Sequence, residues 1–504
     1  MMANLKIDVY KQHFTVKSST YDYLLEAVCN RLISYRFEWD YKSKRTVRKE
    51  DKYFFVKDIR KKLYRFPIGV LRDTILTLGM RGITKDEIVL RNHGYDITPV
   101  NIGMNVNKSF TLRDYQVRAV DEIVNRSNLP TSLLLLMTGY GKSLISMAAM
   151  AKLNFRFGMI LLPKFIDKWL IDLKKYTDLT DDDITVIQGS DSLRKIMFNN
   201  DISSKVIVFS SRTLSNYFSN YETFGEVFDY PTPPDELMEH LKIGCMVSDE
   251  THLEFHVTFR AMLYFNVYHM LGMTATLYSK DGRTEYLYSL LYPDSSRIKD
   301  VVKIEPHIDV YAINYRFTTM KGIRYKRSQG YSHILYEQSI MLRSRLLKSY
   351  LDMINYYTQY GYIHRKQSGQ KCLIFCASVE LCSIVANYLA ERYPKLDIRT
   401  YTQDDDYKNV LEADITVSTI LSSGTAIDIP GLITSINTIA IDSKNSNAQT
   451  FGRLRKIDGV DTRYYYLYNS SIDVHRRYHK NRTDLLRPIS KSYNYEYYPQ
   501  ELVN

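Results

Sequence analysis

The 504-residue sequence contains no apolar run near the length of about 20 residues that a membrane-spanning helix requires. Its first residues also lack the apolar core of a secretory signal, because Lys6, Asp8 and Lys11 interrupt it. The five cysteines are scattered and have no spacing typical of zinc ligands. We therefore expect a cytoplasmic protein with buried thiols and no membrane partner.

Glycine and proline are also scarce, with 21 and 13 residues, while 45% of the residues are hydrophobic. This composition predicts a folded protein of about three domains. The formal net charge of +12 favours a polyanionic partner such as nucleic acid, although a generally basic protein remains an alternative. The 43 tyrosines suit the core, and some can stack on bases.

One stretch has the pattern of a phosphate-binding loop. The apolar run Leu133–Leu136 predicts a buried strand, and Gly139, Gly141, Lys142 and Ser143 follow it before a helical run. The glycines allow successive N–H groups to converge on an anion, and a helix N-terminus adds partial positive charge. Lys142 would reach the β- and γ-phosphates of ATP, and Ser143 would ligate Mg²⁺.

The loop pattern is incomplete, because Leu136 occupies the position of its first glycine and Thr138 precedes the GYGKS core. A strand–turn–helix with a chance lysine therefore stays an alternative. Upstream, Gln116 carries both a donor and an acceptor for an adenine edge, and Arg113 can stack on the base. An ordinary helix start would explain the same two residues.

Repeated strand–helix units follow over residues 106–300, and several predicted strands end in polar residues. The strand near 245 ends in Asp249 and Glu250, which suit Mg²⁺ binding and activation of the attacking water. His252 can couple this site to the next strand, whose end carries the hydroxyls of Thr274 and Thr276. Two surface acids at a strand end are the simpler alternative, and their place after the GKS sequence favours the ATPase reading.

The order LRDYQ, TGYGKS, LLPK, SDETH and GMTAT resembles the first motor lobe of superfamily 2 helicases and translocases. The resemblance implies a RecA-like lobe that binds ATP. It also implies nucleic-acid contacts at the strand ends, which we assign to Pro163, Lys164, Arg212 and Thr213.

A second lobe is expected to follow. A predicted strand ends at Ser418 and Thr419, which we assign to nucleic acid, and the next segment resembles motif V of the family. Within that segment Gly424 and Asp428 would contact the nucleotide. Residues after Ser490 are expected to be irregular.

The sequence from Gln449 to Lys456 resembles motif VI, QxxGRxxR. Charge on the γ-phosphate must be neutralised as its bond breaks, and the guanidinium of Arg453 suits this role. The second arginine position holds Lys456, with Arg455 one residue earlier. One residue along a helix turns a side chain by about 100°, so the second finger is left open between them.

Residues 1–105 predict a small, basic α+β domain. Strands are expected at 35–40 and 53–56, on either side of a basic connection that contains Arg45, Arg48 and Lys49. Arg60 and Lys61 lie near aromatic residues in the sequence, which suits phosphate contact with base stacking. A solvated basic face over a small core is an equal alternative.

The sequence Tyr64–Val70, followed by Gly79–Ile83, is similar to the N-terminal domain of phage UvsW-type helicases. That family remodels branched DNA with ATP, by fork regression, branch migration and unwinding, in DNA replication, recombination and repair. The resemblance implies a bacteriophage protein that acts in the host cytoplasm. Poxvirus-type transcript-release helicases share a similar motor, which keeps RNA as a possible partner.

We therefore predict an α/β fold of two tandem RecA-like parallel-sheet lobes, at 106–300 and 301–504, behind the 1–105 domain. The expected cofactors are ATP and Mg²⁺, and the expected state is a monomer. Three functions remain: a helicase that remodels branched DNA, an RNA helicase or transcript-release factor, and an ATP-gated nucleic-acid clamp without unwinding.

Overall fold

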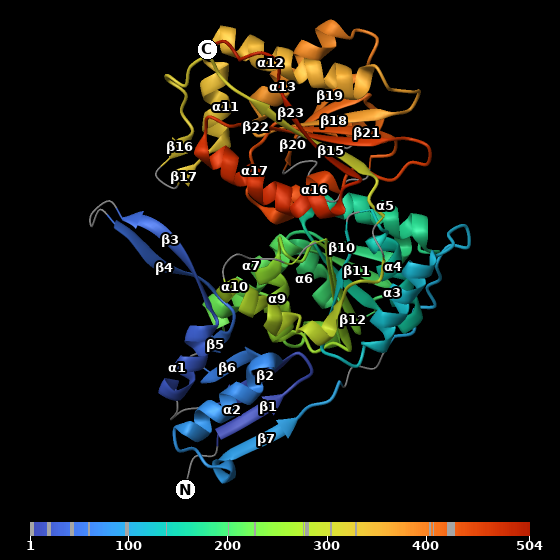
Figure 1. Ribbon diagram of the computed structural model, residues 1–504. Helices are drawn as coiled ribbons and strands as arrows, with labels where there is room; N and C mark the ends of the chain where they lie inside the picture. The colour runs from blue at the N-terminus through green and yellow to red at the C-terminus, as the bar shows by residue number, and fades with distance from the viewer. Residues whose placement is uncertain are drawn as a thin grey trace. The chain divides into compact units, whose positions relative to one another are not determined.

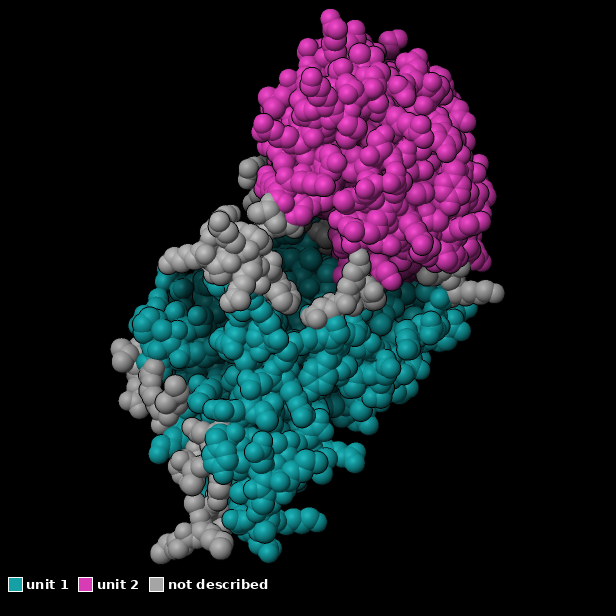
Figure 2. Space-filling model, turned by 60° about the vertical axis from the view of Figure 1, so that its left-hand side comes forward, with its two compact units in different colours: residues 1–136, 141–302 teal, residues 137–140, 303–504 magenta. Residues whose placement is uncertain are grey.

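The structure is a computed structural model, and its chain divides into two compact units (Figures 1 and 2). The first unit contains residues 1–136 and 141–302, and the second contains 137–140 and 303–504. The residues described are 5–17, 22–40, 45–58, 61–95, 100–137, 139–199, 201–225, 228–275, 277, 282–302, 305–327, 330–402, 405–406, 408–420 and 429–504. Within these ranges, no helix is both long and apolar enough to span a bilayer.

The first unit begins with a five-stranded sheet in the order β5-β6-β2-β1-β7. Its elements are β1 (Leu5–Val9), β2 (His13–Lys17), α1 (Asp22–Arg31), β5 (Val56–Asp58), β6 (Leu63–Pro67), η1 (Ile68–Val70), α2 (Leu71–Met80), η2 (Lys85–Glu87) and β7 (Ile88–Asn92). Strand β1 pairs antiparallel with β2 and parallel with β7. The fully buried Ile7, Phe14 and Phe66 anchor its core.

A separate two-stranded sheet leaves this domain between α1 and β5 (Figure 1). Its strands are β3 (Ile33–Asp40) and β4 (Arg45–Tyr53), paired antiparallel from Ile33 opposite Tyr53 to Asp40 opposite Arg45. The expectation of a basic connection at this place is wrong, because residues 45–53 form a strand. Lys, Arg, Glu and Asp have low strand propensity, so the pairing with β3 overrides the local preference.

The rest of the first unit is built on a seven-stranded sheet in the order β10-β11-β9-β12-β13-β8-β14, in which every pair is parallel. Its strands are β8 (Thr131–Leu135), β9 (Phe157–Leu161), β10 (Ile184–Ile187), β11 (Val206–Ser210), β12 (Cys245–Ser248), β13 (His269–Thr274) and β14 (Arg297–Ile298). All residues of β9, β11, β12 and β13 are buried. Continuous apolar strands of this kind require helices on both faces of the sheet.

The helices of this sheet alternate with its strands, as the repeated pattern predicts. They are α3 (Asp114–Asn125), α4 (Lys142–Leu153), η3 (Pro163–Phe165), α5 (Ile166–Tyr176), η4 (Asp181–Asp183), α6 (Ser190–Phe198), α7 (Ser211–Phe224), α8 (Leu237–His240), α9 (Phe255–Tyr264), α10 (Gly282–Leu291) and η6 (Asp294–Ser296).

The N-terminal sheet is attached to this lobe through a buried amide. Gln12 is fully buried, its Nε2 donates to Val267 O at 2.7 Å, and its Oε1 accepts from Val267 N at 3.2 Å. Arg65 also forms a 2.5 Å ion pair with Asp235 of the lobe. Because such reciprocal buried bonds are costly to break, the N-terminal domain and the first lobe form one body.

The second unit repeats the parallel architecture in the order β19-β20-β18-β21-β22-β15-β23. Its strands are β15 (Ile308–Tyr315), β18 (Lys371–Cys376), β19 (Ile398–Tyr401), β20 (Ile415–Thr419), β21 (Leu432–Asn437), β22 (Thr462–Asn469) and β23 (Ser492–Tyr497), with a β16 (Lys326–Arg327) and β17 (Gly330–Tyr331) ribbon. Its helices are α11 (His333–Met341), α12 (Ser344–Thr358), η7 (Gln359–Ile363), α13 (Val379–Arg392), α14 (Lys408–Glu412), α16 (Lys444–Phe451), α17 (Asp473–Leu486) and η8 (Arg487–Ile489).

The prediction of two RecA-like parallel-sheet lobes is thereby confirmed. The prediction of an irregular end after Ser490 is wrong, because β23 pairs in parallel with β15 over six residues. The tyrosines of β23 lie opposite buried residues of β15, such as Val310 and Ala312, and this register cannot be read from the sequence without the position of β15.

Candidate active site

The phosphate-loop sequence lies between β8 and α4, as predicted. Gly141 is the N-cap of α4 and has a left-handed backbone with φ of 80°. The positive φ favours glycine, and a Cβ there would lie 2.4 Å from Nε2 of Gln116, so the Gln116 side chain would have to move. Within the described chain no side chain caps α4, and the N-terminus of a helix favours a bound anion.

Lys142 and Ser143 open the helix at this loop. The Lys142 side chain is almost fully buried, and its Nζ donates to Leu136 O at 3.0 Å. The ammonium group therefore lies folded over the loop, in reach of the groups that a triphosphate would bring. Lys168 of α5 reaches the same point, with its Nζ 3.5 Å from Ser143 Oγ and 3.1 Å from the Asp172 carboxylate.

The acidic pair lies at the end of β12, two strands from β8 in the sheet. The Asp249 carboxylate accepts from the Trp169 indole at 2.8 Å and from the Glu250 backbone N–H at 2.9 Å. Both bonds fix the orientation of a carboxylate that is only 7% exposed. Since parallel strands end at one edge of the sheet, Asp249 and the phosphate loop share the same edge.

Glu250 is held in an unusual backbone conformation. Its φ is 44°, in the left-handed region that β-carbon-bearing residues avoid, and its side chain is 2% exposed. Such strain persists only where the surroundings impose it, and it concentrates at functional sites. The Glu250 Oε2 atom lies 3.4 Å from Nδ1 of His252.

His252 connects the acidic pair to the neighbouring strand. Its Nδ1 lies 2.8 Å from Oγ1 of Thr274, the last residue of β13. Burial, and then the charge of Lys142, lower the pKa of His252 to about 4. The imidazole is therefore neutral at pH 7, so it hydrogen-bonds Thr274, and its 3.4 Å contact with Glu250 is not a charge pair.

The donor set fits Mg²⁺ that is held largely by phosphate oxygens and water. Mg²⁺ takes oxygen ligands and usually receives only one or two carboxylates from a nucleotide-binding protein. The Asp249 carboxylate and the Ser143 hydroxyl supply such oxygens. No cluster of three or more His, Cys, Asp or Glu residues suited to a metal is present among the described residues.

The other residues assigned to the first lobe surround this edge. Gln116 is buried, and its Oε1 accepts from the Arg113 backbone N–H at 2.9 Å. Lys164 lies over the Phe165 ring, next to Pro163, and burial lowers its pKa. Thr213 is buried and accepts from Gly189 N at 2.8 Å, whereas Arg212 beside it is exposed.

In the second lobe, the three basic residues of the motif VI segment have different surroundings. Arg453 is 1% exposed, close behind the buried Gln449 of α16. Arg455 is half-buried and donates to Gly452 O at 2.9 Å. Lys456 forms a 2.8 Å ion pair with Glu305, in which both side chains are more than half exposed. The assignment of a second finger stays a prediction.

Several residues that the sequence analysis assigned to binding or coupling lie away from the ATPase residues or outside the described residues. Ser418 is fully buried, and its hydroxyl donates to the backbone oxygens of Tyr401 and Thr419. Lys61 donates to the Tyr221 hydroxyl of α7 at 2.9 Å. Arg60, Thr138, Thr276, Gly424 and Asp428 lie outside the described residues. Their roles stay predictions.

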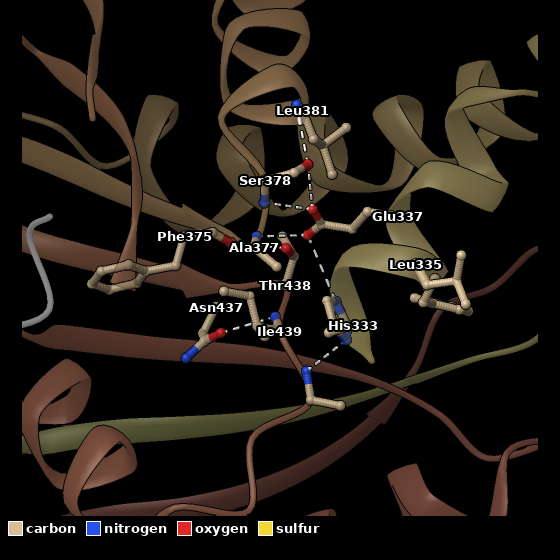
Figure 3. A network of polar contacts seen from close by, with 12 residues as sticks. His333, Leu335, Glu337, Phe375, Ala377, Ser378, Leu381, Asn437, Thr438 and Ile439 are labelled. Carbon is tan, nitrogen blue, oxygen red and sulfur yellow. Dashed lines mark hydrogen bonds and ion pairs between the residues drawn. The ribbon is translucent and has the colours of Figure 1, made fainter. Parts of the chain in front are cut away.

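Two residues with a role in the structure could not be predicted from the sequence. Trp169 donates a hydrogen bond to Asp249 of the acidic pair, and Glu337 of α11 accepts hydrogen bonds from the backbone at the start of α13. Glu337 accepts from Ala377 N at 2.7 Å and from Ser378 N at 2.8 Å, at the start of α13 (Figure 3). Neither residue lies near its partner in sequence, so no local spacing could have shown the contact.

Comparisons with known proteins agree with this geometry. The family model for the res subunit of type III restriction enzymes matches residues 109–279. The DNA 3'-5' helicase XPB of Kineococcus radiotolerans is 31% identical over 186 residues, which cover 36% of this chain and 29% of that protein. XPB of Mycobacterium tuberculosis is 29% identical over 188 residues, covering 37% and 30%. The match thus spans about three tenths of the length of these relatives.

Two solved structures share the fold at low identity. Mss116p bound to single-stranded RNA and AMP-PNP aligns with a TM-score of 0.53 at 13% identity, covering 78% of this chain and 76% of that one. A variant of S. cerevisiae Dbp5 bound to RNA and ADP BeF3 aligns with a TM-score of 0.50 at 12% identity, covering 77% and 91%.

Residues 109–279, about a third of the chain, are thus similar to the res-subunit family. The curated proteins that match a segment of similar length are named DNA 3'-5' helicase XPB. The solved structures share the fold of two RecA-like parallel-sheet lobes.

Proposed function

We propose that this protein is an ATP-driven DNA helicase or translocase that remodels branched DNA. The observation that carries the ATPase part is the convergence of three strand ends in the first lobe. Lys142 follows β8, Thr274 ends β13, and Asp249 follows β12, on three successive strands of one parallel sheet. The DNA part is supported by relatives whose name is DNA 3'-5' helicase and by the net charge of +12.

The roles follow from the chemistry of each side chain. Lys142 and the N–H groups of α4 bind the phosphates, and the Glu250 carboxylate orients and deprotonates the attacking water. Asp249 and Ser143 would hold Mg²⁺, which would supply positive charge beside the phosphates. We assign Arg453 as the arginine finger of the second lobe, because guanidinium matches the charge that develops on the γ-phosphate.

Coupling to movement is assigned to His252 and Thr274. A change at Glu250 during hydrolysis reaches β13 through the 3.4 Å and 2.8 Å contacts of the His252 ring. Nucleotide-dependent closure of the lobes would then alternate their grip on one strand. Contacts to the backbone imply little sequence preference and strong salt dependence.

Steady-state ATP hydrolysis tests the proposal. It is measured without nucleic acid and with single-stranded, duplex, forked and four-way DNA and matching RNA, beside strand displacement on the same forks. We expect the largest stimulation by forked or four-way DNA. The Glu250→Gln variant is the matched control, since it keeps the size and hydrogen-bonding shape of the side chain and removes the base.

Three results would contradict the proposal. Larger stimulation by RNA would favour transcript release. Hydrolysis without strand displacement or branch migration would favour an ATP-gated clamp. Unchanged turnover in Glu250→Gln would remove the active-site assignment itself.

A further inference from the structure

The β3–β4 hairpin, with its strands at Ile33–Asp40 and Arg45–Tyr53, is an extended arm of the first unit (Figure 1). Strand β3 has eight residues, which corresponds to about 27 Å of extended chain. Its two strands pair with each other and with no other sheet of the described chain. A lone two-stranded hairpin is marginally stable in water, so this arm needs either an anchor or a binding partner.

The anchor is Phe54, directly after β4. Its ring is buried against α9, with ring centroids 5.6 Å from Phe255, 5.3 Å from His256 and 4.9 Å from Phe259. The His256 Nε2–H group donates to Tyr53 O at 3.1 Å. Helix α9 begins only three residues after His252, so the arm is fixed to the helix that follows the ATPase acids.

A second contact fixes the opposite strand of the arm. The Tyr35 ring of β3 contacts two guanidinium groups, that of Arg48 at 3.4 Å and that of Arg283 at 4.8 Å from the ring centroid. Arg283 belongs to α10, which follows β13 and Thr274 in the chain. Both strands are therefore held by helices that come directly after the residues assigned to coupling.

The charge of the arm identifies the chemistry of its partner. Residues 33–53 contain seven lysines and arginines against four acidic residues. Arg48, Lys49 and Lys52 on β4 are exposed. Lys61 and Arg65 of the same domain contact the first lobe. Solvent-exposed cations along an extended ribbon suit the phosphates of a duplex.

We infer that the β3–β4 arm is the element that engages the duplex at a DNA junction, and that it moves as one body with the first lobe. This inference rests on the proposed function and adds the element that binds the duplex part of a branched DNA. The motor lobes bind the single-stranded part. The arm thus contributes to the binding of forks and not to the binding of single strands.

Binding of fluorescein-labelled forked DNA and of single-stranded DNA to the full-length protein, measured by anisotropy without nucleotide, tests the inference. One variant replaces residues 36–49 by Asn-Gly, a two-residue turn that keeps Tyr35 opposite Glu50. We expect fork affinity to fall at least tenfold and single-strand affinity to change less than twofold. Single-strand-stimulated ATP hydrolysis should stay within twofold, which also shows that the variant is folded.

Charge reversal gives a milder and independent measurement. Lys49→Glu with Lys52→Glu should weaken fork binding and lower the salt slope of its logarithmic affinity by about two. The control Lys85→Glu with Arg91→Glu makes the same change on exposed residues of the same domain outside the arm. It should alter fork binding less than twofold.

Unchanged fork affinity in both arm variants, or an equal loss for forks and single strands, would overturn the inference. An equal effect of the control pair would do the same, because it would show a general charge effect. If the wild-type protein has no DNA-stimulated hydrolysis, the proposed function fails, whereas the arm is still judged on the fork-to-single-strand affinity ratio.

Discussion

The two lobes contain the same parallel sheet in the same strand order, yet only in the first does a GKS sequence follow the sixth strand. Strand β8 in the first lobe and β15 in the second are both the sixth strand of their sheets. After β8 the chain reaches Gly141 and Lys142 within seven residues, whereas β15 continues into Arg316 and a long connection to α11. The two sheets therefore offer the same position after their sixth strand, but only the sequence after β8 has the pattern that we propose binds phosphate.

The N-termini of α4 and α13 differ between the two lobes in the same way. The N-terminus of α4 has no capping side chain among the described residues, and it faces the loop where phosphates would bind. The N-terminus of α13 is capped by Ser378, and the buried Glu337 carboxylate accepts from the N–H groups of Ala377 and Ser378 just before the helix (Figure 3). Both ends attract an anion, but in the second lobe the protein provides its own.

The largest expected effect is the loss of ATP turnover when Lys142, at the N-terminus of α4, is replaced. Lys142→Ala should reduce ATP turnover about 1000-fold, which corresponds to about 4 kcal/mol of transition-state stabilisation. The reason is that Lys142 is the buried ammonium at the start of α4. Phosphate release at saturating single-stranded DNA measures it, and Lys152→Ala on the exposed last turn of α4 is the control. Equal turnover in the two variants would remove the phosphate site from this loop.

In the second lobe, we expect Arg453 and not Lys456 to contribute to the rate of ATP hydrolysis. Arg453→Ala should lower kcat about 100-fold, because loss of a finger removes charge stabilisation from the transition state. Lys456→Ala should change kcat less than threefold, since Lys456 is exposed and paired with Glu305. The two variants are compared by kcat at saturating ATP. A larger loss for Lys456→Ala would make Lys456 the finger.

The sequence was sufficient for the lobes and for the active-site loop. The buried strands, the helix after Gly141 and the Asp249–Glu250 pair depend on local runs, and each lies where its pattern predicts. The failures share one cause. Strand β4 depends on pairing with its neighbour β3, β23 depends on pairing with the distant β15, and Trp169 and Glu337 acquire their roles from polar groups far away in sequence. Such contacts depend on the packed fold, which no spacing in one sequence encodes.

A substitution at Glu337 tests the contribution of its carboxylate to the N-terminus of α13. Oε1 accepts from Ala377 N, and Oε2 accepts from Ser378 N and Ser378 Oγ, so the amide group of a glutamine would meet a donor at either position. Glu337→Gln should destabilise the start of α13 by about 2 kcal/mol. Hydrogen exchange of the Ser378 amide should then rise about thirtyfold. The control is Glu380→Gln in the exposed first turn of α13, and an equal rise there would contradict the role of Glu337.

The smallest expected effect is a pH dependence confined to the second lobe. Burial raises the pKa of Glu337 to about 7, above its ordinary value of 4.5, despite the hydrogen bonds that favour its ionised form. The folded lobe therefore holds a proton that the unfolded chain releases, so stability is full below pH 4.5 and is lost as the pH rises through 7. The loss between pH 6 and 7.5 should be about 1 kcal/mol.

The neighbours of Glu337 do not titrate in that range. Burial lowers the pKa of His333 well below its ordinary value, and it lowers that of His475 to about 3. Hydrogen exchange of the first amides of α13, corrected for the intrinsic rate at each pH, measures the change. Glu337→Gln should abolish the slope, and the first turn of α4 should show none. A slope that survives in Glu337→Gln would assign the titration to another group.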